Sequence, residues 1–169
     1  MIMDSEPSEY SAEHRNLLLQ KLVSNVPYVS FLGVKFEQKN DNLIVILPFN
    51  PKLIGNPALP ALHGGVTASF LEITAIFGLS YSSVWKNMNP NGKNSTESRL
   101  DQSLQLIPKT IDFTVDYLRS GLPKDAYAKA EVKRAGRRYA SVHVEAWQDK
   151  RSRVFAQASG HFLMPVSRG

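Results

Sequence analysis

The chain has 169 residues, of which 43% are hydrophobic and 21% charged, a composition ordinary for a single globular domain over residues 1–169. The lack of Cys excludes disulfides and thiolate zinc sites, and 4 scattered His residues give no reason to expect a metal site. A net charge of +5 suits an anionic partner: nucleic acid, anionic lipid or a phosphorylated cofactor.

The first regular pattern lies in residues 8–25, where apolar residues recur at helical spacing and predict an amphipathic helix that ends before Pro27. Residues 1–10 have neither the basic nor the apolar region of a secretory signal, so we expect a cytoplasmic protein. Residues 31–39 and 42–49 then alternate in the manner of two strands and predict a hairpin. The proline-containing residues 50–62 predict a loop.

A long apolar stretch follows between Gly64 and Val84, and Glu72 is the one charged residue in it. A helix that is apolar nearly all round is a buried helix. A carboxylate inside it costs free energy unless it is bonded or takes part in chemistry. Glu72 is therefore a candidate general base or nucleophile, and a structural Glu bonded to a nearby Ser, Thr or backbone group is the alternative. Its central place also argues against a membrane-spanning helix.

Residues 86–106 are polar and show no sustained period, so we expect an irregular excursion, such as a lid or a helix fragment. From residue 108 onward the sequence alternates with a period of two residues, which predicts antiparallel strands with one apolar face. The residues expected on that face are Ile111, Phe113, Val115 and Tyr117; Ala128, Ala130 and Val132; Ala140, Val142, Val144 and Ala146; and Val154, Ala156, Ala158 and Phe162. The predicted class is α+β, with one long central helix wrapped by a curved antiparallel sheet of about six strands.

This order of elements, with His63-Gly64-Gly65 opening the helix and Glu72 nine positions after the His, resembles the hotdog-fold acyl-CoA thioesterases of the 4HBT superfamily. Among them it is most similar to the phenylacetate-pathway branch. The resemblance runs from about residue 31 to 164, the expected hotdog core. Its further motifs are Thr110-Ile111-Asp112-Phe113 leading to Tyr117-Leu118-Arg119, the Gly136-Arg137 turn, and Ala156-Gln157-Ala158-Ser159-Gly160-His161-Phe162.

The resemblance implies an acyl-CoA substrate, no cofactor beyond the CoA moiety of that substrate, and Glu72 as the catalytic carboxylate. It also implies that the backbone N–H of Gly65, beside Gly64 at the start of the helix, is the oxyanion donor. Seven residues separate Gly65 from Glu72, which is about 10 Å along a helix, so one helix cannot bring both to one carbonyl. The family answers this with a two-fold dimer that shares its sites, and we expect a homodimer or a dimer of dimers.

Three further positions take supporting roles from the same resemblance. Thr110 would hydrogen-bond the water or the carboxylate, although a strand-start Thr without a role is an equal alternative. His63 would cap the helix or orient the loop. Asn56 would position the water, with a turn-forming Asn as the alternative.

Arg134, Arg137 and Arg138 surround the Gly136 turn, where the family holds the nucleotide end of CoA. Guanidinium groups are natural ligands for its phosphates, and a solvated turn is the alternative. On the acyl side, the pocket wall would come from Phe70, Ile73 and Phe77 of the helix and from the excursion at 86–106.

Three other functions compete with hydrolysis. The first is a non-catalytic acyl-CoA-binding protein, and the second is a hotdog dehydratase or hydratase, for which the chain lacks the matching His and acid. Nucleic-acid binding rests on net charge alone, without interleaved aromatic and basic residues, so we expect neither a nucleic-acid partner nor membrane insertion.

Overall fold

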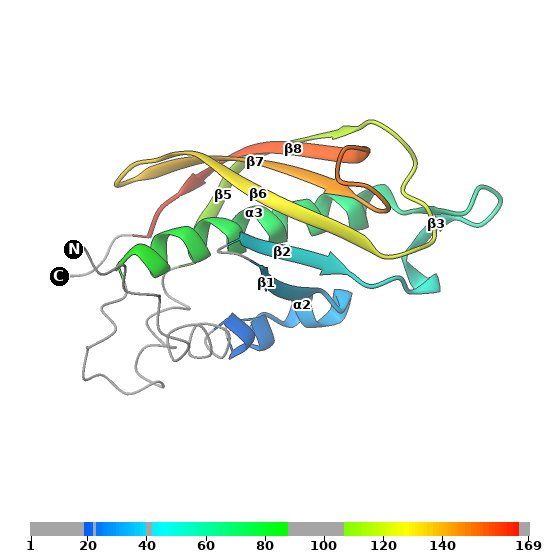
Figure 1. Ribbon diagram of the computed structural model, residues 1–169, viewed down its shortest axis with the longest axis horizontal. Coiled ribbons are helices and arrows are strands. Elements are labelled where there is room, and N and C mark those ends of the chain that lie inside the picture. Colours follow the sequence, from blue (N-terminus) through cyan, green and yellow to red (C-terminus); the bar gives the residue numbers. More distant parts are fainter. Residues whose placement is uncertain (1–18, 22, 40–41, 88–106, 166–169) are drawn as a thin grey trace, which may run out of the picture.

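The computed structural model describes residues 19–21, 23–39, 42–87 and 107–165, and within these ranges a six-stranded sheet curves around one long helix (Figure 1). The predicted α+β class with a central helix and an antiparallel sheet of about six strands is thereby confirmed. The prediction that residues 1–169 form one domain includes residues outside these ranges and stays a prediction. The elements are β1 (Lys35–Lys39), β2 (Asn42–Leu47), α3 (Gly64–Asn87), β5 (Lys109–Tyr117), β6 (Ala126–Ala135), β7 (Tyr139–Trp147) and β8 (Val154–Leu163).

The sheet has the order β1-β2-β6-β7-β8-β5, and all five neighbouring pairs are antiparallel. β1 and β5 are therefore its two edges. In Figure 1, β7 and β8 lie above α3, and β1 and β2 lie below it. The inner face of β6, β7 and β8 is lined mostly by small buried residues, namely Ala126, Ala128, Ala140, Val142, Val144, Ala146, Ala156 and Ala158. These short side chains let the helix approach the sheet closely, so the apolar alternation of the sequence becomes the helix-covered face.

α3 is buried as its composition predicts, with Phe70, Leu71 and Leu79 fully inaccessible. Phe77 and Ile73 are buried too, and the Phe77 ring contacts that of Phe36 on β1 at 4.9 Å between centroids. In the single chain Phe70, Ile73 and Phe77 fill the core between helix and sheet, and the expectation that they line an acyl pocket stays a prediction. No helix in the described ranges is long and apolar enough to span a bilayer.

The N-terminal part departs from the sequence prediction at one place. The described residues 19–21 and 23–24 are helical, as expected, while residues 8–18 and 22 of the predicted helix lie outside the described ranges. A second short helix, α2 (Pro27–Leu32), then takes residues 31–32 from the predicted first strand. Pro27 begins α2 and Gly33 ends it at φ 70°, so the strand starts only at residue 35.

The predicted loop 50–62 is more ordered than expected. It contains a short 3-10 helix, η1 (Pro51–Leu53), and a small antiparallel pair, β3 (Ile54–Asn56) and β4 (Ala61–Leu62). Backbone bonds from His63 N–H to the Leu53 carbonyl and from Leu62 N–H to the Gly121 carbonyl, both 2.8 Å, fasten this hairpin to the rest of the chain. Residues 86 and 87 of the excursion predicted at 86–106 belong to α3, and residues 88–106 lie outside the described ranges.

The close contact between Gly78 of α3 and Ala130 of β6 predicts the effect of one core substitution. A Cβ built on Gly78 of α3 would stand 2.5 Å from the Cβ of Ala130 on β6. Overpacking costs about 1–3 kcal/mol, and the gain in helix propensity returns at most about 1 kcal/mol. We therefore expect Gly78→Ala to lower the free energy of unfolding by about 1 kcal/mol in urea denaturation. The double variant Gly78→Ala/Ala130→Gly should recover part of the loss, and an unchanged midpoint in the single variant would contradict this account of the contact.

Candidate active site

Glu72 lies in the middle of α3 and bonds to Thr110 at the start of β5. The Thr110 hydroxyl donates to Glu72 Oε1 at 2.7 Å, and both side chains are half-buried. Glu72 is thus less enclosed in the single chain than its apolar helix suggests. In the part of the chain that the structure describes, no group bonds the other oxygen, Oε2. Thr110 therefore holds one oxygen of the carboxylate, and none of the described groups holds the other.

A β-bulge at Ile111 brings Thr110 to this position. Thr110 pairs with Phe162 and Asp112 pairs with His161, so Ile111 is an extra residue without a partner on β8. The sequence alternation placed Ile111 on the apolar face, and this prediction is wrong, because Ile111 is 53% exposed. Thr110 takes the inward place instead, since the extra residue shifts the alternation by one position.

The start of α3 carries a second group of contacts. The Gly65 N–H donates to His63 Nδ1 at 2.9 Å, so the imidazole caps the helix, and the ring proton is on Nε2. The Tyr117 hydroxyl, at the far end of β5, donates to the Gly64 carbonyl at 2.9 Å. Sequence reasoning gave Tyr117 no role at the helix start, and no local signal could, because 53 residues separate it from Gly64.

The hairpin before the helix supports His63 by close approach. A Cβ on Gly55 would stand 2.9 Å from His63 Cα, so only glycine lets β3 lie against this residue. Asn56, proposed as a water ligand, is exposed, and its Oδ1 accepts the N–H of Ala58 at 3.0 Å. This bond belongs to the turn between β3 and β4, which is the turn-forming role that the sequence left open.

The structure therefore brings the predicted residues together in two groups. One contains Glu72 and Thr110, and the other contains His63, Gly64 and Gly65. Both glycines and Glu72 belong to one continuous 24-residue helix. Two helical turns, about 10 Å, separate the two groups within one chain.

The basic residues form a third group at the turn between β6 and β7. Arg134, Arg137 and Arg138 line a hollow of about 500 Å³ together with Tyr139, Ser141 and His161. His161 Nδ1 lies 3.0 Å from an oxygen of Asp112. Lys133, on β6 just before this turn, is paired with Glu131 at 2.7 Å. The hydrogen bond from Lys133 and its positive charge lower the pKa of the Glu131 carboxyl.

Strand register relates this basic turn to the carboxylate. Thr110 pairs with Phe162, Phe162 with Ala140, and Ala140 with Ala135, which immediately precedes the turn. The row crosses three inter-strand spacings, about 14 Å in all. The basic hollow thus lies at the same end of the sheet as the Thr110–Glu72 pair.

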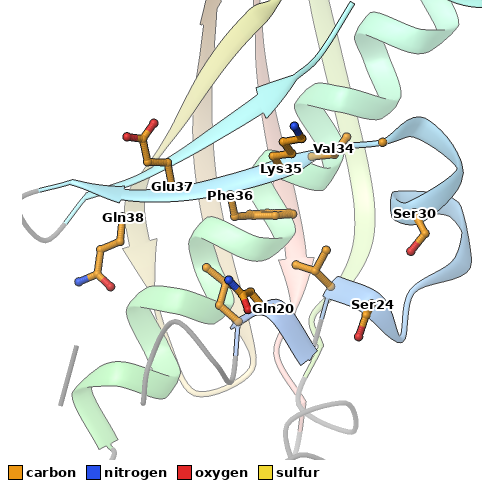
Figure 2. A pocket seen from close by; sticks show the side chains of 11 residues that line it. Gln20, Ser24, Ser30, Val34, Lys35, Phe36, Glu37 and Gln38 are labelled. Atoms are coloured by element: carbon orange, nitrogen blue, oxygen red, sulfur yellow. The ribbon is translucent and has the colours of Figure 1, made fainter. Parts of the chain in front are cut away.

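A second hollow of about 680 Å³ lies between the helical residues 19–21 and 23–24, α2 and β1. Figure 2 shows Phe36 within its lining, with Gln38 and Glu37 leaving opposite faces of β1. None of the predicted site residues lines it. Nor does any group of three His, Asp or Glu side chains in the described ranges come close enough to hold a metal ion.

Comparison with known proteins places this geometry in a family. The sequence profile described as "Thioesterase superfamily" matches residues 59–155, which include α3 and the strands β5, β6 and β7. The medium/long-chain acyl-CoA thioesterase YigI of Salmonella typhimurium is 33% identical over 131 residues, 76% of this chain and 80% of the relative. Its namesake from Escherichia coli (strain K12) is 30% identical over 149 residues, 88% of this chain and 92% of the relative.

Solved structures agree with the sequence comparison. A protein from Shewanella oneidensis, described as related to the thioesterase superfamily, has a TM-score of 0.70 at 28% identity and covers 95% of this chain and 99% of its own. A protein from Chromobacterium violaceum has a TM-score of 0.62 at 31% identity, with 93% and 97% covered. The resemblance to the 4HBT thioesterases is confirmed at the level of the superfamily, while the phenylacetate-pathway branch stays a prediction. By its sequence and by its fold, this chain belongs to the thioesterase superfamily.

Proposed function

We propose that the protein hydrolyses acyl-CoA thioesters to a free acid and CoA, with Glu72 as the catalytic carboxylate. The observation that carries the proposal is the Thr110–Glu72 bond, which holds one oxygen of a half-buried carboxylate, in a member of the thioesterase superfamily. As a base, Glu72 takes a proton from water while the water oxygen attacks the thioester carbonyl carbon. As a nucleophile, its own oxygen attacks and water then hydrolyses the mixed anhydride. In both routes the C–S bond breaks and the sulfur leaves as the CoA thiol.

The N–H groups at the start of α3 stabilise the oxyanion. The first N–H groups of a helix have no intrahelical acceptor, and the helix dipole favours negative charge there. In the single chain the Gly65 N–H donates its hydrogen bond to His63 Nδ1. His63 is exposed, so its ring can rotate away and leave this donor to the thioester oxygen. Gly65 carries no Cβ that would keep the substrate from the backbone.

Two copies of the chain complete each site, because Gly65 and Glu72 of one helix lie too far apart. β5 offers the surface for this pairing. It is an edge strand with a free row of backbone groups, and Ile111, Tyr117 and Leu118 leave large apolar surface exposed along it. A two-fold axis through this edge creates two equivalent sites, each with Glu72 of one subunit and Gly65 of the other. Two such dimers can pair further into a tetramer.

The CoA phosphates bind at the basic turn. Arg134, Arg137 and Arg138 present guanidinium groups that suit phosphate oxygens in pairs. The turn lies about 14 Å from Thr110 along the strand register, a separation that an extended pantetheine arm can span. The acyl class we propose is medium to long chain, as in the two named relatives.

A non-catalytic binding role and a dehydratase role make different predictions. A binding protein would gain thermal stability with acyl-CoA but release no thiol. A dehydratase would form an enoyl thioester with the C–S bond intact. Thiol release measured beside product analysis separates the three functions.

Removing the carboxylate should remove hydrolysis. We expect Glu72→Gln to lower kcat by roughly a hundredfold to ten-thousandfold, because a glutamine can neither accept the proton nor form the anhydride. The measurement is thiol release from short, medium, long and aromatic acyl-CoAs, with the melting temperature as a check on folding. Glu37→Gln on β1 is the matched control and should retain full activity. Equal activity in Glu72→Gln and the wild type would show that another group is the catalyst.

Thr110 should contribute through its hydroxyl alone. A hydrogen bond to a charged group is worth about 1.5–3 kcal/mol, so Thr110→Val should lower kcat by roughly tenfold to a hundredfold. Thr110→Ser keeps the hydroxyl and should remain within a few-fold of the wild type. Steady-state kinetics on the best acyl-CoA of the panel measures both variants. If Ser and Val cost the same, the hydroxyl is not the group that matters.

The shared site can be tested by mixing two inactive variants. Glu72→Gln and Gly65→Val each destroy both sites of their own homodimer. After unfolding and refolding together in equal amounts, half of the dimers are mixed, and each mixed dimer has one intact site. The mixture should therefore recover about a quarter of wild-type activity. Recovery absent from a mixture whose subunits have demonstrably exchanged would rule out sharing across the two-fold axis.

A further inference from the structure

We infer that Gly160 on β8 is a positioning residue: it makes room for the bulge at Ile111 that turns Thr110 toward Glu72. The inference rests on the proposed function, because it concerns how the catalytic carboxylate is held. Gly160 touches neither Glu72 nor Thr110. It acts through the backbone of β5 beside it, with which it pairs at Phe113.

The register of β5 shows what the bulge accomplishes. From Phe113 to Tyr117 the strand pairs regularly, with Phe113 opposite Gly160 and Val115 opposite Ala158 on the inner face. Continued regular alternation would turn Ile111 inward, opposite Phe162, and Thr110 outward. The extra residue, Ile111, shifts the alternation by one position. Thr110 therefore faces inward and stands opposite the buried Phe162.

The bulge crowds β5 against β8 at one point. A Cβ built on Gly160 would lie 2.8 Å from the Asp112 carbonyl oxygen and 2.5 Å from Phe113 Cδ2. The Phe113 ring packs on the inner face, edge-on to the ring of Phe162 at 6.3 Å between centroids, so an added methyl group presses on it as well. The Asp112 carbonyl belongs to the backbone, and it follows the bulged residue directly. Any side chain at position 160 must therefore displace the strand next to the bulge, and Thr110 moves with it.

The displacement should weaken a bond that depends on position. Thr110 and Glu72 belong to different elements, so the 2.7 Å between their oxygens depends on where β5 lies relative to α3. A shift of β5 by a few tenths of an ångström lengthens this contact and lets the carboxylate turn.

The test is a double-mutant cycle between Gly160→Ala and Thr110→Val in the full chain, with decanoyl-CoA as the probe substrate. We expect Gly160→Ala alone to lower kcat about tenfold, with KM changed by less than about twofold. Combined with Thr110→Val, it should cost less than about twofold more, because the bond that it disturbs is already gone. Gly33→Ala is the control for general destabilisation, because its φ of 70° strains any other residue and it adjoins β1, at the opposite edge of the sheet. Its kcat should stay at the wild-type value.

Equal losses from Gly160→Ala in both backgrounds, or none in either, would overturn the positioning role while leaving Glu72 as the catalyst. If instead Thr110→Val and Glu72→Gln both keep full activity, the proposed function fails, and the inference fails with it.

A second variant covers the case in which Gly160→Ala does not fold. The exchange Thr110→Ile/Ile111→Thr keeps the composition and should be as inactive as Thr110→Val, because the bulge keeps position 110 inward. Retained activity in the exchange variant would mean that simple alternation selects the inward residue, and would overturn the inference.

Discussion

The close contact of α3 with the small-residue face of the sheet is the constraint on which the rest of the structure depends. Alanines along β6, β7 and β8, together with Gly78 on the helix, let the two layers approach until a Cβ added at Gly78 would stand 2.5 Å from that of Ala130. The sheet can then curve around the helix, and its edge strand β5 reaches the middle of α3. This reach places Thr110 beside Glu72. Larger residues on the inner face would hold the strand farther away, so the tight packing and the carboxylate pair have one cause.

The same wrapping leaves the site incomplete within one chain. A straight helix holds Gly65 and Glu72 about 10 Å apart, and curvature of the sheet cannot shorten that distance. The edge strand β5 and its exposed Ile111 lie beside the carboxylate, where in the proposed dimer a second copy brings its own helix start. In the proposed function, a carboxylate at a sheet edge links hydrolysis to assembly, because one surface serves both.

The two faces of the sheet have separate tasks. The inner face is apolar and fixes the helix, while the outer face presents polar pairs such as His143–Ser159 and His161–Asp112. The basic turn at Gly136 follows the last residue of the row of paired residues that begins at Thr110, so it lies at the same end of the sheet as the carboxylate. An elongated ligand with a phosphorylated end and a reactive carbonyl suits this layout, with its anionic end on the outer surface and its carbonyl at the helix.

The sequence by itself determined the order of elements, the buried central helix, Glu72 as its one acid, and the glycine pair that opens it. These features are visible because apolar periodicity and composition act locally along the chain. Tertiary structure decided which residue faces Glu72, which group accepts the hydrogen bond of the Gly65 N–H, and where the first strand begins. The inward place of Thr110 depends on a bulge, and the bulge on the space at Gly160, about 50 residues away in the chain. A period-2 pattern contains no information about such a contact, because the space exists only once the two strands have paired.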